Sequence, residues 1–310
     1  MYKELKQIIE NSNKITLVSH VAPDGDALGS SLAFYLALKR MGKSVKIYNS
    51  TKILAKKYDF LPSYEKITNT FAQNCDLVIS FDCGSFKRLG IQREDYKLVN
   101  IDHHKSNELY GDLNIVDATH ASTSSVVYDI FKSWDSLISR DIALCIYTAL
   151  VEDTNFFSDS STDERVFELA RNLTKLGARP EVVGENLTQR NSLAKLRLDA
   201  LFIDAMVLKK DAKVAIGEVS DDMLKKSGAL RYDTAHLADI LQSLSTVELS
   251  IFTLAMDDKV VKFSLRSKSI DVSTIAIKFG GGGHSGSAGF SVDASKKDEI
   301  IEKILGDLDI

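Results

Sequence analysis

Residues 14–42 read KITLVSHVAPDGDALGSSLAFYLALKRMG, and this stretch sets the fold that we expect for the first half of the chain. Residues 14–19 form a short, β-branched apolar run, which predicts a strand. Residues 27–41 carry apolar side chains at helical spacing and end before Gly42, which predicts a helix. A strand, a loop and a helix in this order are typical of the opening of a βαβ unit.

Three more apolar runs follow, and two helical segments come after them. The runs are SVKIY at 44–48, DLVISF at 76–81 and KLVNI at 97–101. Their nearly continuous apolar character is typical of parallel strands that are covered on both faces. Helices are expected at about 123–132 and 140–151. The alternation predicts an α/β domain with a doubly wound parallel sheet.

The length of the chain predicts two domains, because 310 residues exceed the usual size of one hydrophobic core. We expect a first domain at 1–186 and, at 187–310, a linker helix followed by a smaller α/β domain with a mixed sheet. Pro180 is well placed to begin one long helix running through Leu198 and Met206. Strands are expected further on at 213–219, 247–256 and 259–266, the last two joined as a hairpin through Asp257 and Asp258.

Composition and charge exclude several classes of protein. Hydrophobic residues make up 44% of the chain and charged residues 26%, the balance of a globular protein with a sizeable interior. The longest apolar stretch, 142–151, is far shorter than the roughly 20 residues that span a bilayer, and the N-terminus has no signal-peptide core. The net charge of −4 argues against binding of long nucleic acid through many phosphates.

The three cysteines, Cys75, Cys83 and Cys145, form no CxxC pair. This pattern argues against a thiolate zinc site and fits a reducing compartment. We expect all three thiols to be buried, since free cysteine is among the most buried residue types. Together with the composition, the cysteines predict a cytoplasmic protein that does not associate with a membrane.

Polar side chains of metal-ligand type recur where the predicted strands end. Open parallel sheets build their sites beyond the carboxyl ends of the strands, so these side chains should converge in space. Asp153 joins them from the end of a predicted helix. The set consists of His20, Asp24 and Asp26 after the first strand, Asp82 after ISF, Asp102, His103 and His104 after VNI, and Asp153.

Taken singly, these residues have ordinary explanations. An aspartate after a strand is often only a helix N-cap, and a lone histidine is usually a hydrogen-bonded surface or core group. Taken jointly, imidazoles and several carboxylates without a thiolate form a ligand set for Mn²⁺ or a similar cation. A pair of such cations activates water and polarises a phosphoryl oxygen. The set therefore predicts hydrolysis of a phosphoester or a phosphoanhydride.

The chain resembles the DHH phosphoesterase family. The segments SHVAPDGDALGSS (19–31), SFDCGSFKRLG (80–90), NIDHHKSN (100–107) and LVEDTNFF (150–157) resemble the four motifs of that family, in order. Residues 264–290 resemble the DHH-associated domain with its glycine-rich signature. The two-domain architecture is most similar to the bacterial nanoRNase (oligoribonuclease) and 3′-phosphoadenosine 5′-phosphate (pAp) phosphatase group. One departure is Asn155, where the family commonly has glycine.

The resemblance implies roles for the ligand-type residues. It places one Mn²⁺ on His20, Asp24 and Asp82 and a second on Asp26, Asp82, His103 and Asp153, with Mg²⁺ or Co²⁺ as possible substitutes. His104 is expected to face the scissile phosphate, and Asp102 to orient the histidines.

Substrate contacts are expected mainly in the second domain. Gly280 to Gly283, including Gly281 and Gly282, let peptide N–H groups approach an anion, and His284 adds a directional donor. Arg266 can bind a terminal phosphate with two parallel hydrogen bonds, and its family spacing with the glycines and His284 favours this over the alternative, a solvent-facing strand position. Arg88 is a further candidate phosphate contact or an ordinary surface charge. Residues 122–125 (STSS) read mainly as a helix start.

These features predict a Mn²⁺-dependent enzyme with a cleft between its domains. It would hydrolyse short 5′-phosphorylated oligoribonucleotides to nucleoside 5′-monophosphates and pAp to AMP. A cyclic-di-AMP phosphodiesterase, a pyrophosphatase or exopolyphosphatase, a single-stranded DNA exonuclease and a non-catalytic nucleotide sensor remain alternatives. The resemblance also implies a homodimer, formed through the first domain.

Overall fold

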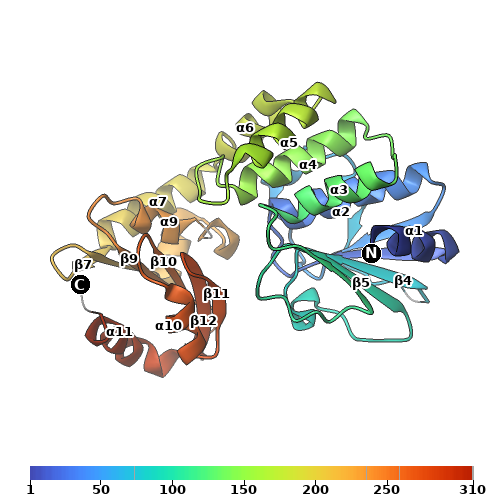
Figure 1. Ribbon diagram of the computed structural model, residues 1–310. Helices are drawn as coiled ribbons and strands as arrows, with labels where there is room; N and C mark the ends of the chain where they lie inside the picture. Colours follow the sequence, from blue (N-terminus) through green and yellow to red (C-terminus); the bar gives the residue numbers. More distant parts are fainter. Residues whose placement is uncertain (73, 235, 258, 309–310) are drawn as a thin grey trace. The chain divides into compact units, whose positions relative to one another are not determined.

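The protein is described by a computed structural model that covers residues 1–72, 74–234, 236–257 and 259–308 (Figure 1). The chain forms two compact units, Met1–Arg190 and Asn191–Ile310. The division lies between helix α6 (Pro180–Thr188) and helix α7 (Leu193–Ala205). The boundary expected at residue 186 lies inside α6.

The single long helix expected from Pro180 is wrong. The chain leaves helical geometry after Thr188, and Ser192 begins α7 as a new helix. The hydroxyl of Ser192 accepts a hydrogen bond from the backbone N–H of Lys195 over 3.0 Å. This capping bond satisfies one of the four N–H groups that a helix start leaves without partners.

The first unit is built on a six-stranded sheet in which every pair of neighbours is parallel, as predicted. The strand order is β3-β2-β1-β4-β5-β6, so the order reverses between β1 and β4. The strands are β1 (Lys14–Ser19), β2 (Ser44–Tyr48), β3 (Ile67–Thr68), β4 (Leu77–Phe81), β5 (Lys97–Asp102) and β6 (Leu113–Val116).

Helices cover one face of this sheet, and α2, α3 and α4 lie together on it in Figure 1. At the centre of their core, the ring of Phe34 lies 5.2 Å from that of Phe81 and 5.3 Å from that of Phe131. A smaller apolar cluster that includes Val78 and Leu98 covers the other face. The helices are α1 (Tyr2–Asn11), α2 (Gly25–Arg40), α3 (Thr123–Ser133), α4 (Arg140–Asp153) and α5 (Glu164–Lys175).

The second unit is built on a mixed sheet with the order β11-β12-β10-β9-β8-β7. The pair β8–β9 is parallel, and the other pairs are antiparallel. The strands are β7 (Val207–Lys209), β8 (Val214–Val219), β9 (Leu249–Ala255), β10 (Val260–Ser267), β11 (Gly282–His284) and β12 (Ser287–Asp293). The helices are α7, α8 (Asp221–Ser227), α9 (Leu237–Gln242), α10 (Val272–Lys278) and α11 (Lys297–Gly306).

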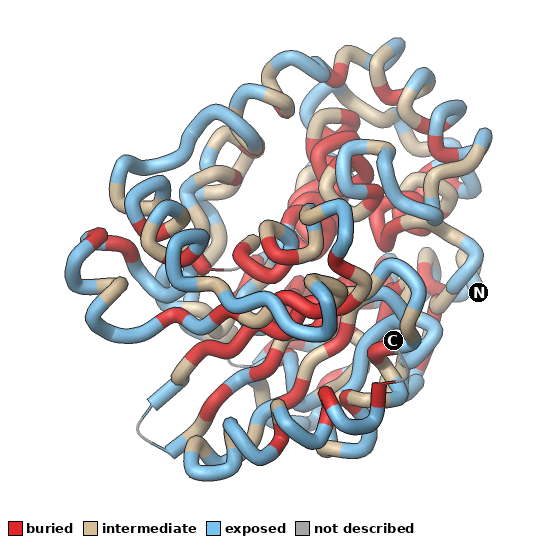
Figure 2. Tube along the Cα trace, turned by 90° about the vertical axis from the view of Figure 1, so that its left-hand side faces the viewer, coloured by how far each residue is buried: buried red, intermediate tan, exposed pale blue. Residues whose placement is uncertain are grey.

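Apolar clusters cover both faces of this second sheet, and Figure 2 shows buried residues recurring along the strands. The predicted hairpin is confirmed, because β9 and β10 pair antiparallel; Asp258 lies outside the described residues. The three cysteines are free and buried, as predicted. Within the described ranges, no helix has the length and apolar character that crossing a membrane requires.

Candidate metal centre

The carboxyl ends of β1, β4 and β5 lie side by side at the middle of the first sheet. His20 follows β1, Asp82 follows β4 and Asp102 is the last residue of β5. Because these strands are parallel neighbours, their ends meet at one edge, where open α/β sheets bind ligands. The structure therefore brings together the ligand-type residues of the first unit.

One group of candidate ligands consists of His20, Asp24 and Asp82. His20 Nε2 lies 3.7 Å from Asp24 Oδ2 and 3.5 Å from Asp82 Oδ2. On the other side of the ring, His20 Nδ1 lies 2.9 Å from the carbonyl oxygen of Val21. A proton on Nδ1 makes that contact a hydrogen bond and leaves the Nε2 lone pair directed at the two carboxylates.

A second group consists of Asp26, His103 and Asp153. His103 Nε2 lies 3.2 Å from Asp153 Oδ2 and 3.7 Å from Asp82 Oδ1. Asp82 therefore directs one carboxylate oxygen at each group. This is the arrangement of a ligand shared by two cations, which the resemblance implies for this residue.

Two of the aspartates are held by helix starts. Asp24 caps α2, since its Oδ1 accepts a hydrogen bond from the backbone N–H of Ala27, and its other oxygen faces His20. Asp26 accepts hydrogen bonds from the first backbone N–H groups of α3, those of Thr123 (2.6 Å) and Ser124 (2.9 Å). The N-terminus of a helix favours a carboxylate in this position. The STSS segment is thus a helix start, as expected, and it also orients a candidate ligand.

Asp82 has a left-handed backbone with φ 54°. Aspartate adopts this region more readily than most residues, and such conformations collect at functional sites. The hydroxyl of Thr123 donates a hydrogen bond to Asp82 Oδ1 over 3.0 Å, which helps to fix the carboxylate.

Around Asp102 of the DHH triplet lies a partly buried polar network that sequence reasoning missed. His104 Nδ1 lies 2.7 Å from Asp102 Oδ1, and Asn107 Nδ2 donates to Asp102 Oδ2 over 2.5 Å. Asn107 Nδ2 also lies 3.3 Å from the carbonyl of Cys83, which directly follows Asp82. The hydroxyl of Tyr110 donates to the same carbonyl over 2.9 Å. Asn107 therefore links Asp102, the partner of His104, to the backbone that directly follows Asp82.

Burial and charge set the protonation of these groups. Burial opposes the charging of His104, but the hydrogen bond to Asp102 and the charge of Asp82 outweigh it and raise the pKa of His104 to about 9. The pKa of His20 is raised to about 10 because contacts with Asp24 and Asp82 outweigh its burial. Burial also raises the pKa of Asp26 and of Asp153, and repulsion by neighbouring carboxylates adds to the effect.

These features fit a cation centre. Asp153 Oδ2 is buried and accepts no hydrogen bond from any residue in the described ranges. Carboxylates that repel one another in a buried site are relieved when cations bind between them. The donor set of imidazole nitrogen and carboxylate oxygen, without thiolate, suits Mn²⁺ and related ions. Divalent cations are therefore the group that these residues can hold.

The departure from the family at Asn155 has a structural explanation. Residues 155, 156 and 157 all have positive φ, and that of Asn155 is 45°. Glycine adopts this region freely, and asparagine is among the other residues that tolerate it best. Asn155 therefore preserves the turn that follows Asp153.

Arg88 lies beside the centre rather than on an isolated surface. It belongs to a short 3₁₀ helix (Phe86–Leu89), and its Nη2 lies 3.1 Å from His20 Nδ1. The backbone of the same residue accepts a hydrogen bond from Val21. This position brings a guanidinium next to a candidate cation ligand.

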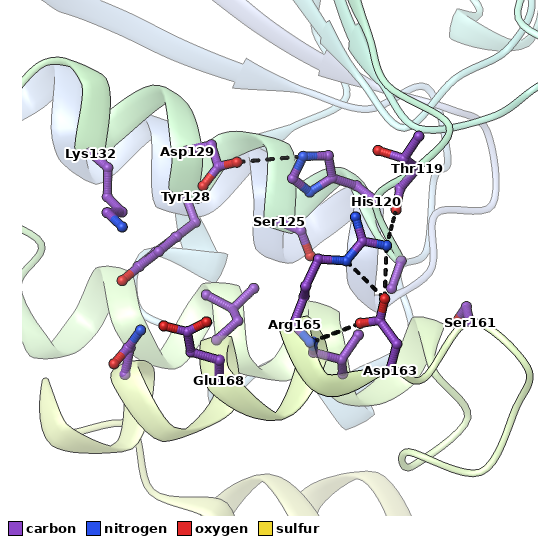
Figure 3. A pocket seen from close by; sticks show the side chains of 14 residues that line it. Thr119, His120, Ser125, Tyr128, Asp129, Lys132, Ser161, Asp163, Arg165 and Glu168 are labelled. Atoms are coloured by element: carbon purple, nitrogen blue, oxygen red, sulfur yellow. Dashed lines mark hydrogen bonds and ion pairs between the residues drawn. The ribbon is translucent and has the colours of Figure 1, made fainter.

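A separate pocket of about 210 Å³ lies between α3 and α5 (Figure 3). In it, Asp163 holds the guanidinium of Arg165, which donates to the carbonyl of Thr119. The next carbonyl, that of His120, lies 3.2 Å from His103 Nδ1. The backbone that lines this pocket therefore also contacts the ring of His103, a candidate cation ligand.

The remaining predicted residues belong to the second unit. Arg266 lies in β10, and its Nε donates to Asp239 Oδ1 over 2.7 Å. Part of the glycine run is regular structure, because Gly282, Gly283 and His284 form β11, an edge strand paired with β12. A side chain at Gly281 would meet the carbonyl oxygen of Gly289 at 2.2 Å, so close approach of two backbones requires glycine there.

Comparison with known proteins defines the class to which this fold and site belong. Residues 14–150 match the family model "DHH family, N-terminal domain", and residues 211–308 match the "DHHA1 domain". The first match lies within the first unit and the second within the second unit. The chain therefore belongs to the DHH family.

The similar proteins match the chain over nearly its full length. A Thermus thermophilus protein described as "Bifunctional oligoribonuclease and PAP phosphatase NrnA" is 27% identical, covering 94% of this chain and 88% of its own. The Bacillus subtilis protein of the same description is 27% identical, and the match covers 100% of this chain and 98% of that protein. A crystal structure of an exopolyphosphatase-related protein from Bacteroides fragilis has a TM-score of 0.88 at 25% identity, covering 98% and 95%.

Proposed function

We propose that the protein is a phosphoesterase that uses two divalent cations, with Mn²⁺ preferred. Its substrates would be short 5′-phosphorylated oligoribonucleotides, cleaved to nucleoside 5′-monophosphates, and pAp, cleaved to AMP. The observation that carries the proposal is the position of Asp82, whose two oxygens face two separate ligand groups. The near full-length similarity to proteins described as oligoribonucleases and PAP phosphatases supports the substrate class.

The cations would be held by His20, Asp24 and Asp82 on one side and by Asp26, Asp82, His103 and Asp153 on the other. When bound, they supply an activated water and neutralise charge on the phosphoryl group. Asp102 fixes His104 through Nδ1, and Nε2 is the ring atom that would face the phosphate. Water adds to phosphorus, the bond to the ribose 3′-oxygen breaks, and His104 delivers a proton to that oxygen.

In the proposal, the second unit binds the terminal 5′-phosphate through Arg266, the glycine-rich segment and His284. Arg266 is paired with Asp239, and the side chain of Asp239 is 60% exposed. Exposed ion pairs contribute about 0–1 kcal/mol, so a phosphate dianion can replace Asp239 at little cost. The homodimer, the cytoplasmic location and the domain boundary stay predictions.

One hydrolysis panel tests the proposed function. With Mn²⁺, the purified protein is given pAp, the dinucleotide pApA, longer oligoribonucleotides, cyclic-di-AMP and pyrophosphate. We expect the highest kcat/KM on pAp and the short linear oligonucleotides. Faster turnover of pyrophosphate would favour the pyrophosphatase alternative, and preference for cyclic-di-AMP would favour the cyclic dinucleotide alternative.

Arg266→Ala is expected to weaken binding of 5′-phosphorylated substrates selectively. A charge-assisted hydrogen bond is worth about 1.5–3 kcal/mol, so KM for pApA should rise roughly 10- to 100-fold. The variant and the unmodified protein should cleave ApA, which lacks the 5′-phosphate, with the same kcat/KM. Asp239→Asn is the matched control, because it removes the negative charge that faces Arg266 and keeps the guanidinium. An equal loss on both dinucleotides would show that Arg266 does not read the terminal phosphate.

A further inference from the structure

Helices α2 and α4 approach each other closely along a line of small residues. A side chain at Gly29 would meet the carbonyl oxygen of Cys145 at 2.5 Å and the Cβ atom of Ala149 at 2.8 Å, so this approach requires glycine. Gly25 lies one turn earlier on the same face of α2. A side chain there would meet Glu152 Oε2 at 1.9 Å. The contact of Gly25 with Glu152 is therefore the last one along this line.

Candidate cation ligands lie next to both residues of this contact. Gly25 separates Asp24 from Asp26, and Glu152 directly precedes Asp153. Asp24 belongs to one ligand group, and Asp26 and Asp153 belong to the other. The contact therefore joins the start of α2 to the end of α4, two segments that are far apart in the chain and supply ligands to the same centre.

The carboxylate of Glu152 is anchored on the side that faces away from Gly25. Its Oε1 accepts hydrogen bonds from Nζ of Lys57 and from the hydroxyl of Tyr58, each over 2.6 Å. Both donors belong to a short 3₁₀ helix (Lys56–Tyr58), and Tyr58 is buried. Hydrogen bonds to a charged acceptor are short and strong. Glu152 cannot withdraw from Gly25 without losing them.

The other oxygen of Glu152 has no such support. Oε2 is buried and accepts no hydrogen bond from any residue that the structure describes. A buried acceptor without a donor opposes folding, so native proteins keep few of them, and each calls for an explanation. The position of Oε2 against Gly25, between two segments that carry ligands, offers one.

We propose that Glu152 is a positioning residue that sets the distance between the start of α2 and the end of α4. In this role it holds Asp24 and Asp26 in place relative to Asp153, and it belongs to none of the ligand groups itself. The inference rests on the cation centre of the proposed function. Loss of the side chain would let the segment around Gly25 shift toward α4. The ligands would then lose the spacing that two cations need.

The test is a calorimetric titration of the metal-free protein with Mn²⁺, which measures Kd without reference to activity. Glu152→Ala should raise Kd about 10- to 100-fold, as is typical for residues that support metal ligands. Glu152→Gln has the same shape, and its amide oxygen can accept both hydrogen bonds, so Kd should rise at most about 5-fold. Glu65→Ala removes an exposed carboxylate from a nearby 3₁₀ helix (Tyr64–Lys66) and is the matched control. Tm of each metal-free variant reports whether it is folded.

A double variant tests the contact itself. Gly25→Ala alone places a methyl group against the anchored carboxylate and should weaken Mn²⁺ binding about 10-fold or more. In the double variant with Glu152→Ala, the methyl group occupies space that the carboxylate has left. Binding should therefore be tighter than in Gly25→Ala, so the two effects should not add.

Three results would overturn the inference. They are an unchanged Kd in Glu152→Ala, an equal loss in Glu152→Gln, which would assign the effect to charge rather than position, and fully additive effects in the double variant. Each of them leaves the proposed function standing, because the unmodified protein still binds Mn²⁺. A protein that binds no Mn²⁺ at all would refute the proposed function and this inference with it.

Discussion

Asp82→Asn is expected to lower Mn²⁺-dependent turnover by at least about 1,000-fold while the protein stays folded. Asp82 Oδ2 lies 3.5 Å from His20 Nε2 and Oδ1 lies 3.7 Å from His103 Nε2, so one carboxylate serves both ligand groups. Asparagine has nearly the same size, can keep the hydrogen bond from Thr123, and tolerates the left-handed φ of 54°. The substitution therefore removes the charge and little else.

Thermal unfolding reports this change without reference to activity. Mn²⁺ at 100 times its Kd should stabilise the unmodified protein by about 2.7 kcal/mol, which raises Tm by roughly 5–10 °C. Asp82→Asn should lose most of that rise. Asp76→Asn is the matched control, because Asp76 precedes β4 at the opposite end of the strand. Substantial turnover by Asp82→Asn, or an undiminished Mn²⁺ response, would contradict the shared-ligand arrangement.

Asn107→Ala should lower kcat by about 10- to 100-fold with little change in KM. Asn107 donates to Asp102 and accepts from the side chain of Asn100 over 3.0 Å, so it acts on His104 through Asp102. Loss of the amide leaves Asp102 less firmly oriented, and His104 then samples positions from which it cannot serve the leaving oxygen. Asn107 is thus a positioning residue.

Steady-state kinetics and Mn²⁺-dependent Tm separate this role from simple destabilisation. Tyr110→Phe provides the comparison, since it removes a hydroxyl that donates to the same Cys83 carbonyl but, among the described residues, forms no hydrogen bond with Asp102. We expect Tyr110→Phe to change kcat only a few-fold. If both variants lose kcat equally, the network supports the Asp82 turn and does not orient His104.

Much of the fold follows from local patterns. Apolar runs at 14–19, 44–48 and 97–101 become β1, β2 and β5, because a strand buried on both faces needs an unbroken apolar sequence. The boundaries differ where a capping bond decides them. Helix α2 begins at Gly25, two residues before the predicted start at 27, because Asp24 accepts the N–H of Ala27.

The types and chain positions of the candidate ligands were also readable from the sequence. Parallel strands place their carboxyl ends at one edge, so residues that follow β1, β4 and β5 must approach one another. Asn107 could have been found as the asparagine that closes NIDHHKSN. Its hydrogen-bond partners could not be predicted in this way, because Cys83 and Asn100 lie next to Asn107 only once the loop is folded.

Sequence alone determined the central strands and the main helices of the first unit and which chemical groups stand at their ends, because strand and helix patterns depend on neighbours along the chain. Tertiary structure alone decided how those groups face one another: that each oxygen of Asp82 meets a different histidine, that the start of α3 holds Asp26, and that glycines 282 and 283 form an edge strand. These outcomes depend on distances of about 3 Å between atoms far apart in the chain, and only the packing of the whole unit sets such distances.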